Sequence, residues 1–307
     1  MSESKETMSA TVSESVSPWK DSRVKSNYRR RQFIDRSIVA FVIIGLIAVL
    51  YPLIDVLYMF AYRGLTLISI PILTETTTGG TGGGGGISNT IVGSAVLIGL
   101  SSAIVVPLGV FSGVYLAEFA GDRNRFAEVI RFVSDILAGV PSIVLGYVGY
   151  LLFVQYFRWG YSPMAAALTL SILMLPYIVR TTELAIRRVP DSIREGAIAL
   201  GSTKASMINR LTLRFAIPGI LTGVMLAVSI SFSETAPLLY TADFNNYMPS
   251  ALFHVPIGFL TYIVWVYSQE PYVQAHNLAY VASFILLSFV FLVNFVARVV
   301  LKRFSKI

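Results

Sequence analysis

The sequence predicts an all-α polytopic membrane protein with six transmembrane helices, and three observations lead to this fold class. The composition is 55% hydrophobic and only 13% charged, which differs from that of an ordinary soluble domain. Six apolar stretches are each long enough to cross a bilayer, which takes about 20 residues. The basic residues lie almost entirely in the segments on one side of those six stretches.

The six predicted spans are apolar runs separated by polar or glycine-rich segments. Pro52, Pro141 and Pro176 fall within them, and a bundle tolerates such prolines because neighbouring helices can satisfy the freed carbonyls. Residues 1–33 are predicted to be a disordered cytoplasmic tail and not a signal peptide, because the first apolar run begins late and is too long. Residues 34–307 then form one transmembrane domain, with spans at about 37–61, 89–117, 132–156, 162–183, 215–238 and 277–300.

The positions of the basic residues orient the spans. Of the 24 Lys and Arg residues, only Arg63 and Arg158 lie on one side, and the other 22 lie in the tail, in the 118–131 and 180–214 loops, or near the C-terminus. Segment 239–276 has neither Lys nor Arg. Because cytoplasmic loops carry the excess of positive charge, we predict a multi-pass protein of the cell membrane with both termini in the cytoplasm. The basic tail is expected to touch anionic membrane lipids and not nucleic acid.

The composition leaves little material for covalent chemistry. There are no cysteines and only two histidines, so disulfides and thiolate sites are excluded and a histidine metal site is not expected. The sequence has no GxxxxGK[ST] pattern, so it lacks a nucleotide-binding P-loop of its own. We therefore expect no catalytic residue, no cofactor and no metal. The run Gly79–Gly86 in the first outer loop is either a flexible linker or a set of backbone N–H groups that approach an anion.

A charged stretch, residues 187–214, separates the fourth and fifth spans and is predicted to form two short helices. Ser192 and Glu195 have the spacing of a capping box, which would start the first helix at Ser192. Gly201 suits the left-handed position that ends this helix, and the hydroxyl residues that follow can cap the second one. A helix pair this polar is expected to meet another protein or the aqueous phase rather than lipid.

Acidic residues within or beside the spans are candidates for polar contacts in the membrane. An acid in a span costs about 2.5–3.5 kcal/mol on insertion scales, so it usually faces a cavity or a partner. Glu234 lies near the outer end of the fifth span, beside Ser229 and Ser233, which are four residues apart and share one helical face. These residues either make structural hydrogen bonds or line a path for a polar substrate. Asp135 is predicted to pair with Arg131, four residues before it.

The charged stretch also matches a known family. The pattern Glu195-Gly-Ala-x3-Gly201, followed by Leu211-Thr-Leu213, resembles the EAA loop of the binding-protein-dependent ABC-importer permeases, although Gly196 replaces the usual first Ala and Arg214 replaces the usual Pro. The resemblance implies an ABC-importer type I permease-like fold, in which a cytoplasmic coupling-helix loop docks on an ATPase subunit. The coupling residues that it implies are Glu195, Gly196, Ala197, Gly201 and Leu213.

A second motif narrows the class. The pattern Ser233-Glu-Thr-Ala-Pro-Leu-Leu239 resembles the Gly-Glu-Thr-Ala-Pro-Leu-Leu signature of phosphate-importer permease subunits, and Gly113-Val-Tyr-Leu-Ala-Glu-Phe119 and Leu137-Ala-Gly-Val-Pro-Ser-Ile143 match as well. The resemblance covers residues 36–303. Related proteins usually have Arg four residues before the glutamate, where this chain has Ile230, so a partner subunit would have to supply positive charge. The predicted substrate-pathway residues are Ser229, Ser233, Glu234 and Thr235.

The resemblance implies an assembly with a second permease subunit, two ATP-binding subunits and an extracytoplasmic phosphate-binding protein. The predicted function is that of the membrane permease subunit of an ATP-driven phosphate importer, which catalyses no reaction itself. Two alternatives stay open: a permease of another ABC importer, for molybdate, sulfate or an organic solute, or a proton- or sodium-coupled secondary transporter. An intramembrane enzyme is disfavoured because no candidate catalytic group lies beside a base.

Overall fold

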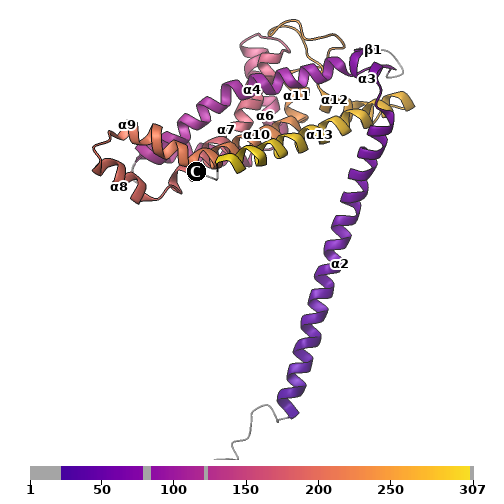
Figure 1. The fold of residues 1–307 in the computed structure, drawn as a ribbon. Coiled ribbons are helices and arrows are strands. Elements are labelled where there is room, and N and C mark those ends of the chain that lie inside the picture. Colours follow the sequence, from indigo (N-terminus) through magenta and orange to yellow (C-terminus); the bar gives the residue numbers. More distant parts are fainter. Residues whose placement is uncertain (1–21, 79–83, 121–123, 305–307) are drawn as a thin grey trace, which may run out of the picture. The chain divides into compact units, whose positions relative to one another are not determined.

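The computed structural model describes residues 22–78, 84–120 and 124–304. The chain divides into two units, Met1–Met59 and Phe60–Ile307. Within the described residues the elements are helices, apart from one two-stranded hairpin (Figure 1). Five helices are long and apolar enough to cross a membrane, and a sharply bent pair of helices makes a sixth candidate. The predicted fold class, an all-α polytopic membrane protein, is confirmed.

Helix α2 (Ser22–Leu67) contains the first candidate span, Phe33–Leu67. It begins inside the tail that the sequence predicts to be disordered, so residues 22–33 are helical, and the rest of that tail lies outside the described residues. Most apolar side chains of the first unit are exposed from Phe33 onward, with Phe41 at 77%. Such exposure suits a helix surrounded by lipid or by a partner protein.

The second unit contains the remaining elements, several of which continue into a π-helical turn. Helix α7 is its central helix, because 61% of the α7 span is buried, compared with 28% for the spans of α4 and α10 and 17% for that of α13. In chain order the elements are α3 (Ile70–Thr74), β1 (Thr77–Thr78), β2 (Gly84–Gly85), α4 (Ser88–Val114), η2 (Tyr115–Phe119), α5 (Arg125–Gly139), α6 (Ser142–Gly149), η3 (Tyr150–Tyr156), α7 (Pro163–Arg187), α8 (Asp191–Ala199), α9 (Lys204–Met207), η4 (Ile208–Thr212), α10 (Leu213–Phe232), α11 (Ala236–Thr241), α12 (Leu260–Tyr262), η5 (Ile263–Tyr267) and α13 (Val273–Phe304).

Part of the glycine run forms the antiparallel hairpin of β1 and β2. The Gly86 N–H, just after β2, donates to the Thr76 carbonyl at 3.1 Å. A Cβ on Gly86 would lie 2.4 Å from the Glu75 carbonyl oxygen, so the backbone approaches too closely for a side chain. Gly84–Gly86 are therefore held by pairing and packing and do not form a flexible linker, while residues 79–83 of the run lie outside the described residues.

Small residues let α4 and α10 approach the central helix α7. A Cβ on Gly113 of α4 would lie 2.5 Å from the Cβ of Thr182 on α7. A Cβ on Gly223 of α10 would lie even closer to α7, 1.8 Å from the Oγ1 of Thr181. Helices in membranes pack closely at such small residues because van der Waals contact drives their association. Helices α4, α7 and α10 thus form the centre of the bundle.

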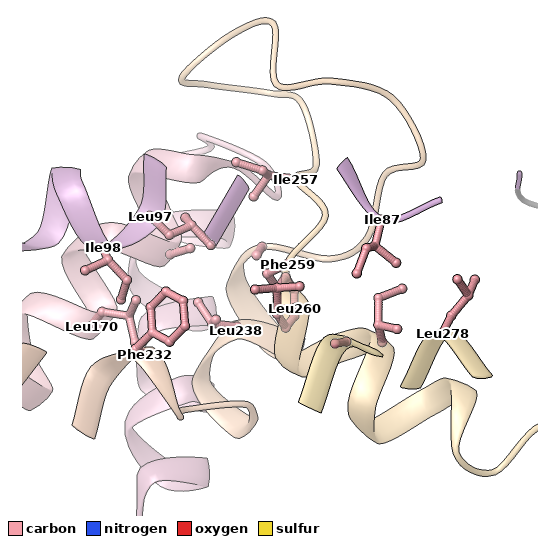
Figure 2. Close-up of a cluster of buried hydrophobic side chains, with 14 of the residues drawn as sticks. Ile87, Leu97, Ile98, Leu170, Phe232, Leu238, Ile257, Phe259, Leu260 and Leu278 are labelled. Atoms are coloured by element: carbon pink, nitrogen blue, oxygen red, sulfur yellow. The ribbon is translucent and has the colours of Figure 1, made fainter. Parts of the chain in front are cut away.

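The largest apolar cluster joins segments that are far apart in the sequence (Figure 2). Leu97 of α4, Leu170 of α7 and Leu278 of α13 belong to it, together with Phe259 from the irregular segment before α12. The Phe232 ring at the end of α10 stacks on Phe289 of α13, with 3.7 Å between the ring centroids. One core therefore connects four long helices with the irregular segment.

The third predicted span is not one helix. Helices α5 and α6 are bent by 108° at Val140–Pro141, so the predicted span 132–156 corresponds to a bent pair of helices and not to one continuous helix. Val140 has ψ 130, an extended conformation, because the proline ring disfavours helical geometry at the residue before it and lacks an N–H to continue the helix. Pro176, in contrast, lies inside the continuous helix α7.

The fifth predicted span also ends early. Helix α10 stops at Phe232, and the three residues that follow are not helical before α11 begins at Ala236. Pro237 occupies the start of α11, where its missing N–H would be unpaired in any helix. The prediction of one helix over 215–238 therefore covers two helices and the link that carries Glu234.

Candidate functional site

Both breaks in the predicted spans lie at one cavity of about 220 Å³. Glu234 is the acidic residue in its lining, and Ser142 at the start of α6 lines the same cavity. The Glu234 carbonyl accepts a hydrogen bond from the Thr261 hydroxyl at 2.9 Å, which holds the link in place. The full lining is Leu137, Ala138, Val140, Ser142, Leu145, Leu173, Tyr177 and Glu234.

The other predicted pathway residues lie near Glu234 but not in the lining of this cavity. The Ser229 hydroxyl donates to the Met225 carbonyl at 2.9 Å, and the Ser233 hydroxyl donates to the Ser229 carbonyl at 3.2 Å. Ser233 is exposed and Thr235 is half-buried. Because α10 ends at Phe232, Glu234 does not continue the helical face of the two serines. Ser142 was missed as a site residue, although the motif at 137–143 contains it.

The charged stretch forms the predicted helix pair, α8 and α9. Helix α8 begins at Asp191 behind Pro190 and has no side-chain cap, so the predicted capping box of Ser192 and Glu195 is wrong. Pro190 starts the helix instead, since its fixed φ is already compatible with the turn that follows. The prediction for Gly201 is confirmed: its φ is +80.

The turn between α8 and α9 is held by hydrogen bonds at the end of α8 and at the start of α9. The Ser202 N–H donates to the Ala197 carbonyl at 3.0 Å and the Gly201 N–H donates to the Ile198 carbonyl at 2.9 Å, the two bonds of a Schellman motif. The Thr203 hydroxyl accepts from the Ser206 N–H at 3.3 Å and caps α9, as predicted for the hydroxyl residues at this position. The helix pair therefore has a defined shape.

The predicted coupling residues divide between the two faces of the helix pair. Glu195 and Gly196 are exposed, whereas Ala197 is 4% exposed and packs against Met207 and Ile208. Gly201 is exposed in the turn, and Leu213 is half-buried beneath the pair. The outer face also carries two apolar side chains that the motif did not single out, Ile198 at 59% and Leu200 at 89% exposure.

A buried ion pair anchors this helix pair. Arg194 of α8 lies 3.0 Å from Glu118 of η2, and their side chains are only 18% and 5% exposed. The sequence analysis missed this pair, although Glu118 belongs to the quoted motif at 113–119. Residues 76 positions apart cannot be paired from spacing alone.

A second buried carboxylate, Glu183 of α7, holds three arginines. Its side chain is 3% exposed and lies 2.9 Å from Arg131, 3.1 Å from Arg187 and 3.5 Å from Arg180. The predicted pair of Arg131 with Asp135 is therefore wrong, and Asp135 is exposed. A buried carboxylate needs a counter-charge more than an exposed one does, so the arginine turns toward α7. The sequence does contain a signal for part of this cluster: positions 180, 183 and 187 are three and four residues apart, so their charges lie on one helical face.

Comparison with known proteins agrees with this architecture. Residues 105–306 match the family described as binding-protein-dependent transport system inner membrane component. The chain is 37% identical over 272 residues to the phosphate transport system permease protein PstA 2 of Mycobacterium tuberculosis, covering 88% of this chain and 89% of that protein. It is also 37% identical over 254 residues to PstA of Yersinia pestis, covering 83% and 85%.

Solved structures show the same fold at low sequence identity. The MetNI methionine ABC transporter in an inward-facing conformation matches with a TM-score of 0.55 and 18% identity, covering 71% of this chain and 95% of that one. A bacterial ABC transporter involved in the import of alginate matches with a TM-score of 0.56 and 13% identity, covering 90% and 98%. The chain therefore belongs to the family of inner-membrane components of binding-protein-dependent transport systems, together with the PstA proteins.

Proposed function

We propose that this chain is the membrane permease subunit of an ATP-driven phosphate importer. The observation that carries the substrate is the 37% identity, over 88% of the chain, to a relative named as a phosphate transport permease. The likeness of the fold to ABC-transporter permeases supports an ATP-driven mechanism. The subunit itself catalyses no reaction and binds no nucleotide, because ATP hydrolysis belongs to its partners.

The cavity at Glu234 supports a pathway for a protonated oxyanion. A carboxylate repels an anion, but it accepts a hydrogen bond from the hydroxyl of a monoprotonated phosphate. The Ser142 hydroxyl can donate to a phosphate oxygen, and the N-terminus of α6 begins at this same residue. Helix N-termini favour anions through their free N–H groups and the helix dipole. These donors offset part of the repulsion from Glu234.

We also place Ser229, Ser233 and Thr235 on the pathway. Ser233 is exposed in the single chain, so it is accessible to a passage formed between two permease subunits. The lining of the cavity contains no arginine or lysine, and the chain has Ile230 at the position where the family resemblance leads one to expect Arg. A PstC-like second permease subunit therefore supplies the positive charge in this proposal.

The helix pair is the proposed docking element for the ATPase. Glu195, Gly196 and Gly201 lie exposed on it, while Ala197 and Leu213 pack beneath it. Ile198 and Leu200 give this surface two neighbouring exposed apolar side chains, and grouped exposed apolar side chains, rather than single ones, mark protein-binding surfaces. In this proposal the helix pair of this chain docks one PstB-like ATP-binding subunit. A second PstB-like subunit docks on the other permease subunit, so the complete importer contains two.

The remaining partners and the orientation are part of the same proposal. A PstS-like phosphate-binding protein delivers the substrate on the extracytoplasmic side, and both termini and the helix pair lie in the cytoplasm. The distribution of the 24 Lys and Arg residues supports this orientation, because positive charge is retained on the cytoplasmic side. Membrane lipids surround the spans.

The proposed mechanism is alternating access. Closure of the ATPases moves the helix pair, which rocks the central helices α4, α7 and α10 between outward-open and inward-open states. A ligand shifts such an equilibrium only through contacts that differ between the two states. Docking of the ATPases on α8 provides those contacts.

Reconstitution of the complete importer in liposomes tests the proposal. We expect ATP hydrolysis that is stimulated by phosphate with its binding protein, and accumulation of radiolabelled phosphate inside the vesicles. Stimulation by molybdate or sulfate, but not by phosphate, would assign the chain to another ABC importer. Uptake by the purified chain alone, driven by a proton or sodium gradient without ATP, would assign it to the secondary transporters.

A further inference from the structure

One arginine joins the helix pair to two spans at once. The Arg194 guanidinium donates to the Ile186 and Val189 carbonyls, each at 2.8 Å, at the end of α7 and just beyond it. It also contacts Glu118 at 3.0 Å and Asp191 at 2.8 Å. The same side chain therefore binds η2 at the end of α4, the end of α7, and the first turn of α8.

A lysine makes a second, independent contact between the pair and η2. The Lys204 ammonium of α9 donates to the Glu118 carbonyl at 2.7 Å and lies 4.8 Å from the centroid of the Phe119 ring. Both short helices are thus held to the same π-helical turn. The apolar cluster between the two short helices is small, since its buried members are only Ala197, Met207 and Ile208. The polar contacts of Arg194 and Lys204 therefore matter for how the pair is held.

These contacts determine how the pair can move. A helix of nine residues, such as α8, is not stable alone in water, so its position depends on what holds it. A planar guanidinium with several directed donors fixes orientation better than an ammonium does. Because the bonds of Arg194 reach both α4 and α7, a displacement of α8 is passed to both helices together.

We propose that Arg194, held by Glu118 and by the carbonyls at the end of α7 and just beyond it, is the positioning residue that transmits movement of the helix pair to the spans. This inference rests on the proposed function, because it assigns the joint through which the ATPases drive transport. It predicts that variants that remove the contact between Arg194 and Glu118 still assemble with the ATPases and hydrolyse ATP, but transport less phosphate for each ATP hydrolysed.

The decisive measurement is the amount of phosphate transported per ATP hydrolysed by the reconstituted importer. We expect Arg194→Gln and Glu118→Gln each to lower this ratio severalfold relative to the wild type. Arg194→Lys keeps the charge and should retain more coupling than Arg194→Gln. The matched control is Arg188→Gln, which removes an exposed arginine of the same loop that makes no ion pair among the described residues.

A distance measurement separates a loosened joint from a misfolded protein. The natural chain has no cysteine, so spin labels can be attached at Phe111→Cys on α4 and Ser192→Cys on α8, both exposed. We expect the distance distribution between them to broaden in Glu118→Gln and to stay narrow in Arg188→Gln. If Arg194→Gln does not assemble, Glu118→Gln decides the question in both assays.

An unchanged transport ratio in Glu118→Gln, with an unchanged distance distribution, would overturn the inference. The wild-type importer distinguishes this outcome from failure of the proposed function. If the wild type does not transport phosphate, the substrate assignment fails. If the wild type transports phosphate and the variants keep the wild-type ratio of transport to ATP hydrolysis, the proposed function stands and only the role of Arg194 is refuted.

Discussion

Replacing Glu183 by Gln removes the shared counter-charge of three arginines while keeping the volume of the side chain. The carboxylate of Glu183 is 3% exposed and is contacted from α5 by Arg131 and from its own helix by Arg180 and Arg187. The variant therefore leaves three positive charges around a neutral amide at the end of α7. We expect it to destabilise the second unit.

The three ion pairs of Glu183 contribute unequally to the free energy of unfolding. Arg131 is 24% exposed and lies 2.9 Å from Glu183, so its bond to a charged group is worth about 1.5–3 kcal/mol. Arg187 and Arg180 are 44% and 50% exposed, so each pair contributes at most about 1 kcal/mol. Since Gln retains one acceptor oxygen, the expected loss is about 2–4 kcal/mol. At about 2–4 °C per kcal/mol, Tm should fall by roughly 4–16 °C.

Thermal unfolding of the purified protein in detergent measures this shift. Asp135→Asn is the matched control, because it removes an exposed acid of α5 at the position predicted from the sequence to bind Arg131. We expect that control to change Tm by no more than about 2 °C, as for most surface substitutions. Equal losses in both variants, or a larger loss in Asp135→Asn, would refute the assignment of Arg131 to Glu183.

Three further predictions concern the pathway, the helix pair and the bundle. Glu234→Gln and Ser142→Ala should each reduce phosphate uptake at normal expression, whereas Ser283→Ala, which removes a serine that bonds within its own helix α13, should not; unchanged uptake in both cavity variants would remove the cavity from the pathway. Gly201→Val forces a branched side chain into a residue with φ +80, at a cost of about 1–2 kcal/mol, and should weaken co-purification with the ATPase; undiminished co-purification would show that the turn is not needed for docking. Gly113→Leu places a side chain where α7 is already in contact and should abolish the monodisperse folded protein in size-exclusion chromatography, an expectation that a normal elution profile would contradict.

The apolar spans and the helix pair could be predicted because their signals are local. A run of about 20 apolar residues has few alternatives to a membrane helix, since every backbone group must be satisfied internally. The turn at Gly201 is equally local, because a glycine between two short helical segments relieves the strain of the left-handed conformation. The capping box failed because Pro190, two residues before Ser192, caps the helix instead, and Ser192 then lies inside α8.

The sequence marks the breaks in the third and fifth spans with prolines but does not determine that the helices break there. Pro141 directly precedes α6 and Pro237 lies in the first turn of α11, so each follows a break, but Pro176 lies inside the unbroken helix α7. A proline lowers the stability of a helix without dictating a bend, and the surrounding packing decides between a bend and a continuous helix. The placement of Ser142 beside Glu234, from two separate breaks, was therefore decided by the tertiary structure.

The sequence by itself determined the fold class, the six apolar stretches and the position of the charged helix pair between the fourth and fifth of them. Which charges meet was decided by the packing of α4, α5 and α7, because burial makes Glu118 and Glu183 demand partners that exposed acids such as Asp135 do not require. These pairs join residues 52 and 76 positions apart. Spacing along a helix shows which side chains share a face, but only the folded bundle determines which faces lie together.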